Sequence, residues 1–247
     1  IDELLRHVER LHQAAPRLFV AMLGGGAGTY ASLGKQGPPV QQGIGRLLGF
    51  GSMTVPSRAI GDHLAENICI LGLLAATCGK IGREIYTLMK TEFGEVEEPV
   101  PPGTVGSSTM PQKRNPKLCQ DIIAAAAEVR SLVPLALEAM TTEHEADRTT
   151  SLMMDSAEAR ACIATGDLLS RLAEIMRGLD AIPHLEIVRI HSRVPPAESA
   201  ELAPEEAEAA PEPQLAAAAH LQQALMLAPH HHHQQQQLLQ QAHRLHR

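Results

Sequence analysis

Aromatic residues are nearly absent from this sequence, and their scarcity limits the fold class. The chain of 247 residues contains three phenylalanines, two tyrosines and no tryptophan, so that aromatics make up 2% of it. Strands favour aromatic and β-branched residues, whereas the plentiful Ala, Leu, Met, Gln and Glu favour helices. We therefore expect an all-α protein with enough residues for one large domain or two small ones.

An excess of positive charge is also missing. The formal net charge is −7, which argues against generic binding to nucleic-acid phosphates. We find no secretory signal and no apolar run of transmembrane length, so we expect a cytoplasmic protein with no membrane partner. The first residue is Ile within a helical pattern, which suggests part of a longer chain.

Cysteine pairs with metal-ligand spacing are missing as well. The four cysteines show no CxxC spacing and lie within apolar helical runs. We expect buried, reduced thiols, with neither a zinc site nor a disulfide framework. These residues are Cys69, Cys78, Cys119 and Cys162.

Helical periodicity accounts for most of the first 180 residues. In the Pro-free stretch 57–91, apolar residues recur at alternating steps of three and four, which predicts a long helix packed lengthwise. Asn115 is placed to cap a later helix, and Pro116 to be its first residue. Long helices joined by loops predict a bundle. The expected helices span residues 2–22 with a bend near Pro16, 40–48, 57–91, 116–140 and 151–179.

Two segments have a composition that could be mistaken for a functional motif. "GGGAGT" resembles part of a nucleotide-binding loop, but it follows a helix instead of the strand that such a loop requires. We interpret it as a helix break for close packing, with a glycine-rich backbone lying against a ligand as the alternative. Residues 181–247 are acidic, Pro/Ala-rich and then His/Gln-rich, including "HHHHQQQQ". This composition predicts weak order or a need for a partner, so we treat 181–247 as an atypical C-terminal segment without a catalytic role.

The loop "GSSTMPQKRNP", Gly106–Pro116, combines groups suited to taking a proton from carbon. A proton beside a carboxylate is very weakly acidic, so a base must lie within reach and the resulting negative charge needs positive partners already in place. The serine hydroxyls lie beside Lys113, Asn115 offers an amide donor, and the start of the next helix contributes partial positive charge. The same composition also suits a plain connecting loop.

This loop resembles the signature loop of the fumarase/aspartase superfamily, because it matches every fixed position of GSSxMPxKxNP. "KIGREIYTLMKTEFGEVEEP", "LGGGAGTYASLG" and "EAMTTEHEADRTTS" resemble neighbouring segments of the branch that contains adenylosuccinate lyase and 3-carboxy-cis,cis-muconate cycloisomerase. The resemblance covers residues 1–180, the later half of a family subunit. It implies the long-helix bundle of that superfamily, a homotetramer with shared active sites, and chemistry that uses no metal or organic cofactor.

The resemblance also implies roles for individual residues. Ser107 would be the base that takes the Cβ proton, and Lys113 with Asn115 would hold the carboxylate that stabilises the carbanion. Their alternative roles are a solvated cation for Lys113 and a helix cap for Asn115. The expected substrate-binding residues are Thr29, Ser108, Met110, His144, Arg148 and Ser151, of which Thr29 could equally be a packing residue and His144 an ion-pair member.

Two departures from the family pattern bear on the substrate. The adenylosuccinate lyases carry arginines that help to bind the nucleotide at the positions of Ala146 and Asp155, which makes adenylosuccinate a doubtful substrate. The general acid of the family belongs to the earlier half of the subunit, which this sequence does not contain.

Three functions therefore remain open. The first is reversible β-elimination on a succinyl-type dicarboxylate with release of fumarate. The second is lactonisation of the carboxymuconate type, which Ala146 and "EHE" favour. The third is a non-catalytic helical scaffold. For both enzymatic functions the expected partner is a small carboxylate substrate.

Overall fold

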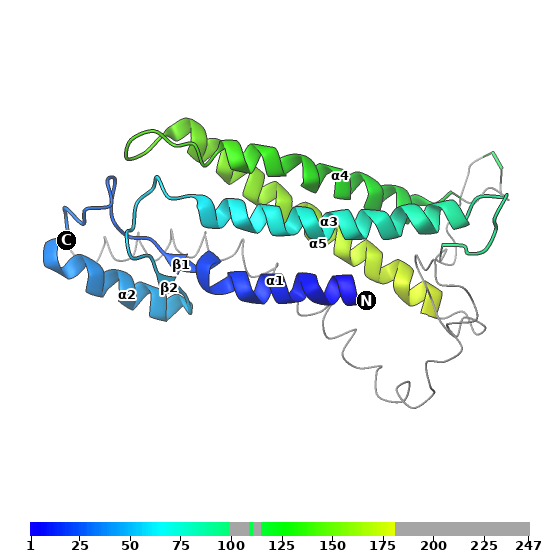
Figure 1. The fold of residues 1–247 in the computed structure, drawn as a ribbon, viewed down its shortest axis with the longest axis horizontal. Coiled ribbons are helices and arrows are strands. Elements are labelled where there is room, and N and C mark those ends of the chain that lie inside the picture. The colour runs from blue at the N-terminus through cyan, green and yellow to red at the C-terminus, as the bar shows by residue number, and fades with distance from the viewer. Residues whose placement is uncertain (99–108, 111–114, 181–247) are drawn as a thin grey trace, which may run out of the picture.

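The computed structural model describes residues 1–98, 109–110 and 115–180, and these form a helical bundle with one short β-bridge (Figure 1). The all-α prediction is confirmed. Ser107, Ser108 and Lys113 lie outside the described residues, as does the C-terminal segment 181–247. The elements are α1 (Asp2–Leu18), β1 (Val20–Ala21), the 3-10 turn η1 (Gly34–Gln36), α2 (Gly37–Leu48), β2 (Gly51–Ser52), α3 (Asp62–Leu88), α4 (Lys117–Glu138) and α5 (Arg148–Asp180).

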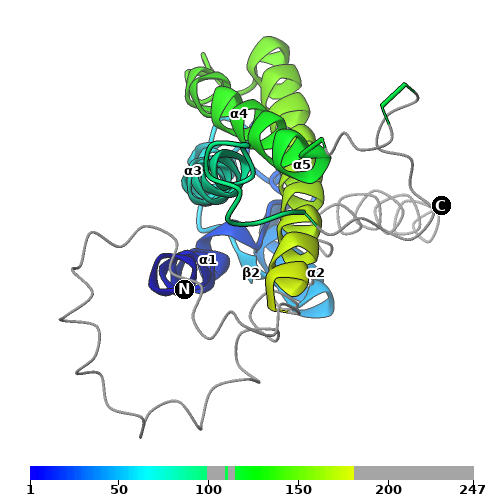
Figure 2. The same ribbon diagram turned by 90° about the vertical axis from the view of Figure 1, so that its right-hand side faces the viewer.

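Helices α3 and α4 form an antiparallel hairpin in which three glycines of α3 allow close approach. A Cβ at Gly72 would lie 2.6 Å from Val133 Cγ2, and one at Gly82 would lie 2.8 Å from Ile122 Cγ2. Between them, Gly79 faces Ala126 in the same way. Because interiors are packed at crystal-like density, these positions have no room for even one methyl group. The core cluster extends along this hairpin and onto α5, which crosses it (Figure 2).

Helix α1 packs on α3 through a chain of hydrogen bonds around the buried His7. Arg10 Nη1 lies 3.0 Å from His7 Nδ1, and a guanidinium can only donate, so Nδ1 is unprotonated and the proton is on Nε2. Nε2 then donates to Thr77 Oγ1 at 2.8 Å, and Thr77 donates to Glu3 at 2.8 Å. Burial, followed by the charge of Arg10, lowers the pKa of His7. This network therefore depends on a neutral histidine.

Helix α2 lies beside the bundle instead of within it (Figure 1). It packs on the parallel β1–β2 bridge, in which Val20 pairs with Gly51. The side chain of Gln41 is almost fully buried, accepts the Leu23 N–H at 2.8 Å and donates to the Met53 carbonyl at 2.8 Å. Gln41 thus joins the segment after β1 to the segment after β2.

All five predicted helices are present, and their first and last residues differ from the predicted ones by at most five positions. The first helix ends at Leu18 because residues 20–21 pair with β2, an interaction between segments distant in sequence that periodicity does not reveal. Three of the four cysteines are buried, Cys69 is partly buried, and all four are free, as predicted. Burial raises the pKa of the Cys78 thiol to about 12, so this thiol is unreactive.

The expectation that no segment has transmembrane length needs one correction. Among the described residues, α3 is long and apolar enough to cross a membrane by length and composition. Its apolarity has a structural cause, because α3 contacts α1, α4 and α5 and supplies much of the core. It is the central helix of the bundle.

Candidate functional site

The described parts of the signature loop lie at the start of α4. Met110 is exposed and Asn115 is partly buried. Glu98, which precedes the loop, accepts the backbone N–H of Leu118 at 3.1 Å and of Cys119 at 2.7 Å. Since Glu98 is itself buried, this carboxylate holds the two ends of the loop together at the helix start.

These contacts correct two predictions about the loop. Helix α4 begins at Lys117 with Pro116 in the cap position, and no side chain of the cap residue bonds to it. The proposed cap Asn115 instead uses its backbone carbonyl, which accepts the Lys117 N–H at 2.8 Å. Because Glu98 occupies the next two N–H groups, the helix start has no free donor for a substrate carboxylate. Lys113 and the Asn115 amide are left as the loop's predicted carboxylate-binding groups.

The other predicted binding residues lie at the opposite end of the hairpin, where α5 begins. Asp147 caps α5, because its Oδ1 accepts the Thr149 N–H at 2.7 Å. The Ser151 hydroxyl donates to the Asp147 carbonyl at 2.9 Å, so towards a ligand it can only accept a hydrogen bond. Arg148 is exposed, and so is His144, whose φ of +55° is in the left-handed region.

An open hollow of about 410 Å³ is found at this end. Small-molecule sites have volumes of about 300–1,000 Å³. The walls come from the segment before α3 and from the first turns of α5. The lining residues are Arg58, Ala146, Arg148, Ser151, Leu152 and Asp155. The structure thus brings Arg148 and Ser151 together in one hollow, whereas His144 is not among its lining residues.

The glycine-rich segment 24–28 packs against Pro56, in the same stretch of chain as Arg58 of the hollow. A Cβ at Gly24 would lie 2.2 Å from the Pro56 carbonyl oxygen, and Gly28 combines a φ of +72° with a 3.1 Å approach to the same atom. The interpretation of this segment as a helix break for close packing is therefore confirmed. Thr29 follows Gly28 and is exposed, and it is not among the residues that line the hollow.

The predicted site residues that the structure describes therefore form two groups within one chain. Asn115 lies just before α4, and Arg148 lies beyond its other end. With 22 residues in α4 and a rise of 1.5 Å per residue, the helix separates the two groups by about 33 Å. A small carboxylate cannot contact both groups in one chain.

Two residues of these regions were missed by the sequence analysis. Glu98 is twenty-one positions from its partner Cys119, and Arg58 enters the hollow from a segment ninety positions before Arg148. Glu98 lies in the segment "KIGREIYTLMKTEFGEVEEP" that resembles the family, but the sequence does not show that its side chain reaches the start of α4. Arg58 lies outside every segment quoted above, and no sequence signal points to it.

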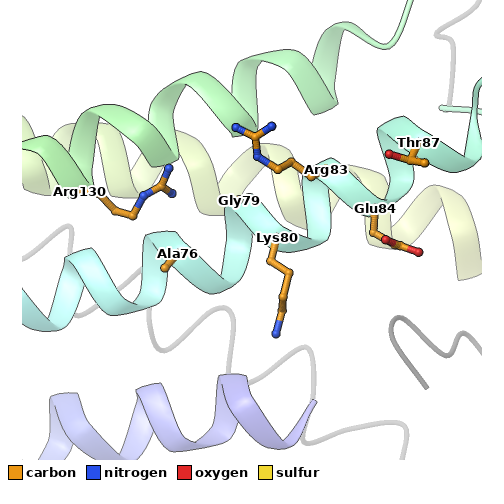
Figure 3. Close-up of a pocket in the computed structure, with 7 residues that line it drawn as sticks. All are labelled: Ala76, Gly79, Lys80, Arg83, Glu84, Thr87 and Arg130. Atoms are coloured by element: carbon orange, nitrogen blue, oxygen red, sulfur yellow. The ribbon is translucent and has the colours of Figure 1, made fainter. Parts of the chain in front are cut away.

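A second hollow, of about 370 Å³, lies midway along the hairpin (Figure 3). Lys80 points towards α1, where it pairs with Glu3 at 2.5 Å, while Arg83 of α3 points towards α4 and Arg130 projects from α4 towards α3. This hollow is basic, but it contains none of the predicted site residues. The hollow at the α5 start is therefore the one that agrees with the predicted binding residues.

Comparison with known proteins agrees with the signature loop. The profile of a protein family described as "Lyase" matches residues 1–131, more than half of the chain. The chain belongs to this lyase family, the fumarase/aspartase superfamily. The family resemblance inferred from the loop is thus confirmed.

Curated relatives of this lyase-family chain have several activities in their names. An N-acetyl-S-(2-succino)cysteine lyase of Enterococcus italicus is 41% identical over 60% of the chain and 32% of the relative. A 3-carboxy-cis,cis-muconate cycloisomerase of Pseudomonas aeruginosa is 44% identical over 59% of the chain and 32% of the relative. An adenylosuccinate lyase of Methanothermobacter thermautotrophicus is 37% identical over 74% of the chain and 41% of the relative.

Solved structures give the same fold. The 3-carboxy-cis,cis-muconate lactonizing enzyme of Pseudomonas putida matches with a TM-score of 0.61 and 34% identity, over 71% of this chain and 41% of that one. The chain thus spans between a third and about two-fifths of the length of these relatives.

Proposed function

We propose that the full-length protein catalyses reversible β-elimination on a succinyl-type dicarboxylate adduct and releases fumarate. The observation that carries this proposal is the complete signature loop in a chain of the lyase family. The buried Glu98 carboxylate at the loop's base supports it, because a catalytic loop needs fixed ends to place its base accurately.

In this proposal Ser107 removes the Cβ proton of the substrate. The electron pair of the broken C–H bond is delocalised into the adjacent carboxylate, which Lys113 and Asn115 hold by charge and hydrogen bonding. The bond to the leaving nitrogen or sulfur then breaks, the double bond of fumarate forms, and the leaving atom takes up a proton from the general acid that the family has in the earlier half of the subunit, while the Cβ proton stays on Ser107. Ser108 and Met110 contribute the loop backbone.

We further propose that each active site contains residues of more than one subunit, as in a homotetramer. The separation of Asn115 and Arg148 by the length of α4 supports this arrangement, because only a second copy can bring the two groups to one substrate. Thr29, His144, Arg148 and Ser151 would then bind the part of the substrate that leaves.

The test is to incubate the full-length protein with S-succinyl and N-succinyl adducts and to follow fumarate by its ultraviolet absorbance. Fumarate release that is lost in Ser107→Ala supports the proposal. Thr109→Ala is the matched control, because it removes an exposed hydroxyl from the same loop at a position that the family pattern leaves variable. No release from any adduct contradicts the proposal and favours the non-catalytic scaffold.

Lactonisation of a carboxymuconate is the second candidate. Its support is the 44% identity to the Pseudomonas aeruginosa cycloisomerase and Ala146 in the hollow, where the lyases that act on nucleotides have an arginine. Lactone formation without fumarate would establish this alternative.

A further inference from the structure

The hollow midway along the α3–α4 hairpin gathers positive charge in a protein that is negative as a whole. Three cations and one carboxylate are among its described lining residues, whereas the chain carries a formal net charge of −7. These charged residues are Lys80, Arg83, Arg130 and Glu84. Lys80 is neutralised by its pair with Glu3. Within the part of the chain that the structure describes, neither Arg83 nor Arg130 has an ion-pair partner, so two cations of the hollow lack a counter-charge there.

The charged side chains of this hollow lie on two sides of α3 (Figure 3). Lys80 and Glu84 point away from α4. Arg83 points towards α4, and Arg130 projects from α4 towards α3. A Cβ on Gly79, one helical turn before Arg83, would lie 3.2 Å from Arg130 Nη1, so the Arg130 guanidinium lies against α3 within about 6 Å of Arg83 along the helix axis. Two like charges this close repel each other unless an anion lies between them.

The uncharged lining residues of this hollow are small. Ala76 and Gly79 have almost no side chain, and Thr87 adds a hydroxyl one turn beyond Arg83. The volume of about 370 Å³ is near the lower limit of small-molecule sites. A guanidinium only donates hydrogen bonds, in a planar fork that fits carboxylate or phosphate oxygens. A ligand for this hollow is therefore small, rich in acceptor oxygens and, to match two guanidiniums, doubly negative.

We infer that this hollow binds a small dianion, a phosphate or a dicarboxylate, between Arg83 and Arg130. The inference is independent of the proposed β-elimination, because none of the predicted site residues lines this hollow. One guanidinium from α3 and one from α4 donate charge-assisted hydrogen bonds to the anion. The anion then links the two helices at the middle of the hairpin. Because it binds the folded state alone, it stabilises the protein.

Calorimetry with the full-length protein measures the affinity, with inorganic phosphate, succinate and acetate as probes above the second pKa of phosphate. We expect the preferred dianion to bind at least about tenfold more tightly than acetate, because one charge-assisted hydrogen bond has about that effect on affinity. Tighter binding of phosphate would identify a phosphate site, and tighter binding of succinate a dicarboxylate site. Acetate binding as tightly as both dianions would overturn the inference.

Variants of the two arginines assign the binding to this hollow. Arg83→Gln and Arg130→Gln should each weaken the preferred dianion by about tenfold, whereas Arg83→Lys should retain part of the affinity. Arg177→Gln, which replaces an exposed arginine in the last turn of α5, is the matched control and should leave the affinity unchanged. Equal dianion affinities in Arg83→Gln, Arg130→Gln and the unaltered protein would place the anion elsewhere and refute the assignment.

Thermal unfolding and particle mass distinguish a dianion from a second subunit as the occupant of the hollow. The preferred dianion should raise the Tm of the unaltered protein and of Arg177→Gln more than that of Arg83→Gln, because only the first two retain both guanidiniums. A smaller oligomer of Arg83→Gln in light scattering, with an unchanged affinity for the dianion, would assign the arginines to a contact between subunits and overturn the inference.

Discussion

The two ends of the α3–α4 hairpin differ in how their polar groups are used. At the loop end, the buried Glu98 carboxylate accepts two backbone N–H groups of α4, so it stabilises the start of that helix. At the α5 end, Arg58 and Arg148 are exposed and line an open hollow. The first end uses its buried carboxylate to hold the chain on both sides of the loop, whereas the second leaves its charged side chains exposed. The two ends therefore offer different groups to the reaction proposed above.

Among the variants that test this difference between the two ends, Ser107→Ala should have the largest effect on the reaction rate. Loss of the base should reduce the rate of fumarate release by at least about a hundredfold, because general-base catalysis contributes about 10²–10⁴-fold. Arg148→Ala should instead raise KM more than it lowers kcat. Steady-state kinetics of the two variants measure this difference. If Ser107→Ala retained full activity, the loop end would have no chemical role.

Mixing the two variants tests whether the ends work across subunits. Chains with Ser107→Ala and chains with Arg148→Ala, unfolded and refolded together, should regain activity well above that of either variant alone, because some sites then combine two intact ends. The comparison is with each variant refolded by itself. Mixtures as inactive as the separate variants would show that both ends act within one chain, contrary to the separation set by α4.

An intermediate effect on stability is expected where α3 approaches α4. Gly82→Ala should lower the free energy of unfolding by about 1–3 kcal/mol, because the new methyl group overlaps Ile122. Gly43→Ala is the matched control in α2, where nothing lies within 4 Å of the added Cβ, and it should raise stability by about 0.5–1 kcal/mol. Chemical denaturation measures both. Equal effects would mean that α3 and α4 are not in close contact at Gly82.

The smallest effect concerns pH and His7, the buried histidine of α1. Because burial lowers the pKa of His7 in the folded state, the unfolded chain binds a proton that the folded chain resists as pH falls below about 6.5. This contribution to stability is therefore present above that pH and lost below it. His7→Gln should remove this loss of stability, so that the free energy of unfolding of the variant falls less than that of the unaltered protein as pH is lowered. His12→Gln, at an exposed position of the same helix, is the matched control.

Sequence reasoning found the elements that depend on local pattern and missed those that depend on distant partners. The spacing of apolar residues between Leu64 and Leu88 was enough to place α3, because a buried helix face repeats along the chain. The cap of α4 was assigned to Asn115, the nearest side chain, whereas Glu98 provides it from across the loop. Arg58 was missed for the same reason, since a hollow is formed by packing and not by a motif.

Gln41 has a consequence for the α5 end described above. Its one amide bridges the chain on either side of α2, holding both the stretch that leads into the glycine turn and the stretch that leads to Arg58. A displacement of either stretch strains the same pair of bonds. Because both bonds belong to one side chain, replacing Gln41 would release the stretch before the glycines and the stretch before Arg58 together.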